Sequence, residues 1–156
     1  MVPNPVGLVC AAWLHDIGYA PQLVVTGLHA LDGARYLRAL GVDPVICSLV
    51  AHHSGAIYEA RERGLKEILE DEFPPAPQAL SDALWYCDMV TGPDGNPTTL
   101  HNRLVEIRRR YGDYHVVTSS LEHAEAELVG AIQRTEELLT IGGRLLPQPM
   151  YGSARR

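Results

Sequence analysis

Helical patterns recur along this chain, and no segment shows the sustained alternation of apolar and polar residues that is typical of β-strands. Residues that start or stop helices separate the segments. Asp43 and Pro44, for example, stand where an N-cap and a first helical residue are expected, and Gly41 closes the preceding segment. The patterns predict helices at about residues 5–17, 30–40, 44–52, 56–69, 78–90, 99–111 and 119–141. We therefore expect an all-α fold, a compact multi-helix bundle.

The length of 156 residues fits a single domain with a substantial core. We expect this domain at residues 1–141 and a flexible C-terminal tail at 142–156, because a pair of glycines ends the last helical pattern. No apolar run reaches the roughly 18 residues that cross a bilayer, and the N-terminus lacks the layout of a signal peptide. These features predict a soluble, cytoplasmic protein with no membrane partner.

The charge of the chain narrows the class of partner. A net charge of −6 argues against sequence-independent binding to nucleic acid. Arg103 and the arginines at 108–110 form a local positive cluster, which we interpret as a solvated helix end. The three cysteines form no CxxC pair and lie in apolar helical segments, so they are interpreted as buried reduced thiols. Trp13, in the first apolar segment, is interpreted as a core residue.

The segment AAWLHDIGYAP, residues 11–21, is an apolar helix that ends on His15 and Asp16. Similar groups lie at helix ends or on apolar helices further along the chain, at His29, His52, His53 and Asp88. Such groups cost free energy when they are buried singly, so a set from several helices indicates convergence on a positive charge. Imidazole and carboxylate together suit Mn, Fe, Zn, Ni or Co better than calcium. We predict one or two divalent transition-metal ions as cofactor, with Mg²⁺ as an alternative.

Four segments, AAWLHDIG, HALDGARYLRALG, LVAHHSG and ALWYCDMVTGPDG, together resemble the HD superfamily of metal-dependent phosphohydrolases. The resemblance covers about residues 6–112 and keeps the order of the family's motifs. It implies an HD-domain-like helical bundle. In that family a histidine, the HD pair and a late aspartate bind one metal, and further histidines bind a second.

Carried over residue by residue, the resemblance assigns His15, Asp16 and Asp88 to the first metal. It assigns His29, and one or both of His52 and His53, to the second. The aspartate of the HD pair can bridge the two ions, which makes Asp16 the predicted catalytic residue.

The chain departs from the family pattern before His15. The family's first histidine lies on a helix well upstream, whereas none of the fourteen residues before His15 is a histidine. Three explanations are open: a start codon assigned too late, a truncated and inactive copy, and a real variant with fewer ligands. Three protein ligands are still the number that an open catalytic site uses. We expect the apolar face of residues 8–17 to lack its usual cover, which predicts either a marginal monomer or a homodimer.

The resemblance implies hydrolysis of a phosphomonoester or phosphodiester by a metal-activated water. The expected substrate is a small phosphorylated molecule such as a nucleotide. Arg35 and Arg38, one and two turns beyond His29, are candidates for binding the phosphate, with solvation at the surface as the favoured role of each. Asp32 is expected to cap the helix or to orient an imidazole. Two alternatives stay open: a di-iron oxygenase with a similar ligand set, and a non-catalytic HD-like domain.

Overall fold

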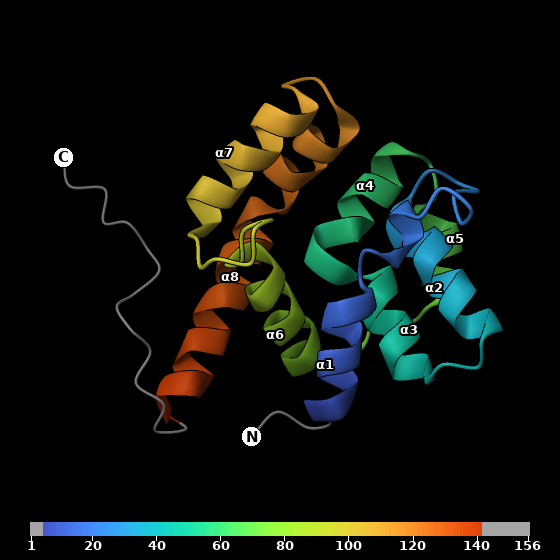
Figure 1. Cartoon of the computed structure of the whole chain (residues 1–156), viewed down its shortest axis with the longest axis horizontal. Coiled ribbons are helices and arrows are strands. Elements are labelled where there is room, and N and C mark those ends of the chain that lie inside the picture. Colours follow the sequence, from blue (N-terminus) through green and yellow to red (C-terminus); the bar gives the residue numbers. More distant parts are fainter. Residues whose placement is uncertain (1–4, 142–156) are drawn as a thin grey trace.

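The structure is a computed structural model that describes residues 5–141 (Figure 1). Its α-helices are α1 (Pro5–Leu14), α2 (His29–Ala39), α3 (Pro44–Ala51), α4 (Ala56–Glu62), α5 (Lys66–Glu72), α6 (Gln78–Met89), α7 (Leu100–Tyr111) and α8 (Val116–Ile141). Two short 3-10 helices are η1 (Ile17–Tyr19) and η2 (His53–Gly55). Within the described residues there is no β-strand, only an isolated bridge between Thr91 and Pro97. The predicted all-α bundle is confirmed, and the predicted tail at 142–156 lies outside the described residues.

Three groups of buried side chains fill the interior, each between a different set of helices. Leu31 and Leu69 belong to the group formed by α2 to α5, and Leu128 belongs to the group formed by α6 to α8. The third group, formed by α1, α3 and α6, includes Leu49 on α3 and Leu84 on α6. In Figure 1, α6 lies between α8 and α1, with α7 and α8 on one side of the molecule. The element η2 packs on both α6 and α8, and η1 packs on α2, so the two short 3-10 helices connect these groups.

Helix starts follow the capping chemistry that the sequence predicts. The Asp43 carboxylate accepts a hydrogen bond of 2.8 Å from the backbone N–H of Val45, with Pro44 as the first residue of α3. Thr99 caps α7 in the same way, through a bond of 3.2 Å from the N–H of Asn102. The side chains at these ends therefore satisfy backbone donors that would otherwise have no partner.

Three predicted helix boundaries are wrong, the first of them at the end of α1, which stops at Leu14 instead of residue 17. The helix predicted at 56–69 is two helices, because Gly64 between them adopts a left-handed conformation with φ 67°. The last helix begins at Val116 instead of residue 119. His115 Nδ1 accepts a hydrogen bond from the N–H of Val117, and the Thr118 hydroxyl donates one to the carbonyl of Gly112. These bonds start the helix one turn earlier than its sequence pattern indicates.

The side chain of Asp32 organises the loop that leads into α2. It is 3% exposed and accepts hydrogen bonds from the backbone N–H groups of Val25, Thr26 and Gly27, at 3.0 to 3.2 Å. The Thr26 hydroxyl donates a further bond of 2.9 Å. The role of Asp32 is therefore to hold the loop immediately before His29.

We expect Asp32→Asn to lower the free energy of unfolding by about 2 kcal/mol, because an amide NH₂ would face backbone donors that lose their charged acceptor. Urea denaturation measures the change. Asp71→Asn, at an exposed position on α5, is the control and should stay within about 0.5 kcal/mol of the parent chain. An effect of that small size for Asp32→Asn would contradict the role assigned to the carboxylate.

The outer face of α1 is apolar and exposed. Trp13 is 85% exposed, and Val6 and Val9 lie on the same face at spacings of a helical turn. The interpretation of Trp13 as a core residue is therefore wrong, whereas the exposed apolar face predicted for this helix is present. Cys87 is also exposed, contrary to its interpretation as a buried thiol, while Cys47 is buried as expected. Among the described residues, no helix is long and apolar enough to span a membrane.

Candidate metal centre

His15 and Asp16 lie in the turn between the end of α1 and the start of η1. The Nδ1 atom of His15 donates to the carbonyl of Ala12 at 2.8 Å, which directs the opposite ring nitrogen away from the helix. This Nε2 atom lies 3.4 Å from the Asp16 carboxylate and 3.6 Å from that of Asp88. The change of backbone direction after Leu14 allows two adjacent side chains to face one site.

A close approach of η1 to α2 brings His29 to the same place. A Cβ atom built on Gly18 would lie 1.9 Å from the carbonyl oxygen of His29, so only glycine permits this approach. His29, the first residue of α2, places its Nε2 atom 3.6 Å from Asp16 Oδ1. The ring of Tyr19 stacks on the His29 ring with centroids 4.0 Å apart. Gly18, in the middle of η1, therefore positions the HD pair against His29.

His53 is the central side chain of the cluster. It is 4% exposed, and its Nδ1 atom donates to the carbonyl of Val50 at 2.7 Å. Its Nε2 atom lies 3.1 Å from His29 Nε2 and 3.7 Å from Asp16 Oδ1. The next residue, Ser54, has a left-handed backbone with φ 43°, and this conformation turns the chain sharply after His53.

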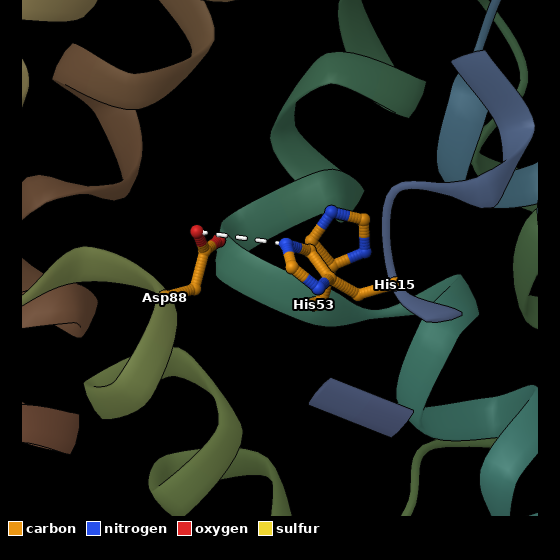
Figure 2. A group of neighbouring side chains, drawn as sticks. All are labelled: His15, His53 and Asp88. Atoms are coloured by element: carbon orange, nitrogen blue, oxygen red, sulfur yellow. Dashed lines mark ion pairs between the residues drawn. The ribbon is translucent and has the colours of Figure 1, made fainter. Parts of the chain in front are cut away.

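Asp88 enters from α6, close to the end of that helix. Its carboxylate accepts a hydrogen bond from the hydroxyl of Ser54 and faces His15. Figure 2 shows His15, His53 and Asp88 pointing toward one another from three separate elements. Residues far apart in the sequence thus form one compact cluster.

The cluster has the donor set of a transition-metal site. Within the described residues, two groups have ligand atoms that all lie within 4.8 Å of one another: His15 with His53 and Asp88, and Asp16 with His29 and His53. Two ligands about 2.1 Å from one ion are roughly 3 to 3.4 Å apart, which fits the 3.1 Å between the histidine nitrogens. The Nδ1 atoms of His15 and His53 each donate a hydrogen bond to a backbone carbonyl. Such bonds fix the orientation of metal-binding histidines in metal sites. The residues present therefore fit a bound cation.

The electrostatics of the cluster favour positive charge beside its carboxylates but not on the ring of His29. Burial lowers the pKa of His15, but Asp88 and Asp16 outweigh it and raise that pKa to about 9. Burial raises the pKa of Asp88, yet the hydrogen bond and charge of His15 hold it well below its usual range. Burial, aided by the neighbouring His53, lowers the pKa of His29 to about 3. The ring of His29 is therefore neutral and keeps a lone pair that can bind a metal.

Three residues proposed from the sequence lie outside this cluster. The Nε2 atom of His52 lies 2.6 Å from the carbonyl oxygen of Phe73 and not in the cluster. Arg35 and Arg38 both bind the carboxylate of Glu72, and neither lines the cleft that borders the cluster. We therefore leave these three side chains out of the ligand and phosphate-binding sets proposed below.

A cleft beside the cluster contains residues that the sequence reasoning missed. Its walls include Tyr19 and Ser54 on the side of the cluster and Arg103 and Arg110 on α7. Arg103 is 13% exposed and lies 3.7 Å from Asp88, so its interpretation as part of a solvated helix end is wrong. The spacing of the two arginines, seven residues apart on one helix face, is the signal that could have identified them.

Comparison with known proteins gives one match. The sequence model of the HD domain family matches residues 3–107. Neither the curated proteins nor the solved structures include a match to this chain.

Proposed function

Since this chain belongs to the HD domain family, we propose that it is a metal-dependent phosphohydrolase acting on a small phosphomonoester or phosphodiester. The observation that carries the proposal is the pair of ligand groups that share His53 and lie at the wall of a cleft. Convergence of three imidazoles and two carboxylates from four parts of the chain has a simple explanation in metal binding, because a buried group such as His53 or Asp88 would be costly without a partner.

His15, His53 and Asp88 would hold one ion, or Asp16, His29 and His53 would hold it instead. The Nδ1 atom of His53 donates to Val50, so its Nε2 atom can bind only one ion at a time, and a second ion would be held by the remaining members of the other group. A bound divalent metal supplies a water of lowered pKa and stabilises charge on phosphoryl oxygens. In hydrolysis the water oxygen bonds to phosphorus while the ester P–O bond breaks and its oxygen leaves with a proton. The carboxylate of Asp16 lies 3.4 to 3.7 Å from the Nε2 atoms of His15, His29 and His53, so it is close to members of both ligand groups.

The walls of the cleft support a small substrate. Ile107 on α7 and Leu121 on α8 add apolar side chains to its lining. The overall charge of −6 does not favour a long polyanion. A nucleotide or another small phosphorylated metabolite fits both features.

We expect the purified chain to contain about one or two equivalents of a transition metal and to hydrolyse some members of a nucleotide and phosphoester panel. Monoesters release phosphate directly, and the monoester products of diesters release it after treatment with an added phosphatase. A chelator should abolish this release, and one of Mn²⁺, Fe²⁺, Co²⁺, Ni²⁺ or Zn²⁺ should restore it. Metal content is measured by mass spectrometry and phosphate by a colorimetric assay. A chain that binds no metal, or one that consumes O₂ with iron and releases no phosphate, would contradict the proposal.

A further inference from the structure

One face of α7 carries three charged side chains, and two of them line the cleft. Arg103, Glu106 and Arg110 follow one another at spacings of three and four residues, so they share a helix face. Arg103 and Arg110 both line the cleft that borders the ligand cluster. Two positive charges and one negative charge leave this face with a net positive charge.

Arg103 is buried next to the cluster with a donor that has no partner. Its Nη1 atom donates to Glu106 at 2.6 Å, and its Nη2 atom lies 3.7 Å from Asp88 Oδ1. Its Nε–H group is buried and has no hydrogen-bond partner among the described residues. Buried polar groups are nearly always paired, so an unpaired guanidinium donor beside a cleft indicates an anionic ligand.

Glu106 connects this arginine to Arg110. One oxygen of Glu106 accepts the bond from Arg103, and the other accepts a bond of 2.9 Å from the Nε–H of Arg110. One carboxylate thus holds two guanidinium groups along the same wall. The outer group, Arg110, lies one to two helical turns further from Asp88 than Arg103 does.

We propose that Arg103 and Arg110, held by Glu106, recognise two anionic groups of one substrate. Arg103 binds the phosphoryl oxygens beside the metal-ligand cluster, and Arg110 binds a second phosphate of the same molecule. The inference rests on the function proposed above and narrows its substrate class to small phosphoesters with two phosphate groups, as in a nucleoside diphosphate. It assigns Arg103 and Arg110 as substrate-binding residues and Glu106 as a positioning residue.

A pair of non-hydrolysable probes tests this assignment: methylphosphonate, with one anionic group, and methylenediphosphonate, with two. Isothermal titration calorimetry measures the affinity of each for the parent chain, for Arg103→Gln and for Arg110→Gln, with and without Mn²⁺. Arg109→Gln, an exposed neighbour on α7 that does not line the cleft, is the matched control. Each variant is compared with the parent chain at the same Mn²⁺ concentration, so that binding of a probe to Mn²⁺ itself contributes equally to both affinities.

Arg103→Gln should weaken both probes by about tenfold or more, whereas Arg110→Gln should weaken methylenediphosphonate by that factor and methylphosphonate by less than about twofold. Arg109→Gln should change neither. Equal loss of both probes in Arg110→Gln, or no loss in either variant, would overturn the proposal. If Arg103→Gln lowers only the melting temperature, Arg103 is a structural residue and the proposal is likewise overturned.

The outcome is separable from that of the proposed function. Absence of metal from the parent chain contradicts the phosphohydrolase, yet the dependence of methylenediphosphonate binding on Arg110 can still be measured without Mn²⁺. Conversely, metal-dependent phosphate release that is the same in Arg103→Gln and Arg110→Gln as in the parent chain supports the phosphohydrolase and refutes the two-phosphate substrate.

Discussion

Replacing His53 with alanine is expected to abolish tight metal binding and the phosphate release that depends on it. The Nε2 atom of His53 is shared by both ligand groups, so its loss leaves each with only two members. Removing groups that merely orient a ligand already costs about 10- to 100-fold in affinity, and loss of the shared ligand should cost at least about a hundredfold. Competition with a chromogenic chelator measures metal affinity, and the phosphate assay measures activity.

His52→Ala provides the matched control from the neighbouring position. Its ring contacts the carbonyl of Phe73 at 2.6 Å and takes no part in the ligand cluster. We expect a loss of about 1 kcal/mol in the free energy of unfolding from the missing hydrogen bond, with metal affinity within about twofold of the parent chain. Equal loss of metal by both variants, with circular dichroism showing that both are folded, would refute the central role of His53.

Gly18→Ala is expected to cost about 3 kcal/mol or more in the free energy of unfolding. The added methyl would lie 1.9 Å from the carbonyl oxygen of His29 and 2.7 Å from the backbone nitrogen of Gly33. Backbone atoms of α2 can move away only if η1 separates from that helix. Because this separation also shifts Asp16 relative to His29, metal affinity should fall as well. Urea denaturation and chelator competition measure the two effects.

Gly130→Ala, in the middle of α8, tests whether the effect arises from the contact with the α2 backbone. There the nearest atom to an added Cβ is the guanidinium Nη1 of Arg134, at 2.9 Å, and this flexible end can move. Alanine is also the better helix former by up to about 1 kcal/mol. We expect unchanged or slightly higher stability for this control. A change within about 0.5 kcal/mol for Gly18→Ala would show that η1 and α2 separate easily.

The sequence predicted most of the helices and most of the cluster, because both depend on local signals. Caps such as Asp43 and the HD pair at the end of an apolar helix can be recognised without knowledge of tertiary contacts. By contrast, His52 and His53 are equivalent in the sequence. The two side chains differ only in the tertiary structure: His53 lies in the cluster, next to the left-handed turn at Ser54, and His52 contacts the carbonyl of Phe73.

The errors concern features that depend on tertiary structure. Trp13 lies in an apolar segment, but exposure is decided by which helices cover that face, and composition does not report this. Arg103 resembles the other arginines of its helix until α7 is placed beside Asp88. The break at Gly64 is the exception, since a glycine between two short charged segments is a local signal of a helix end.

The left-handed backbone at Ser54 implies a trade-off between stability and function within a single residue. A non-glycine residue in this conformation is strained by roughly 1–2 kcal/mol. Glycine would relieve the strain but would remove the hydroxyl that binds Asp88. Selection for a more stable fold and selection for a well-oriented aspartate therefore favour different residues at this position.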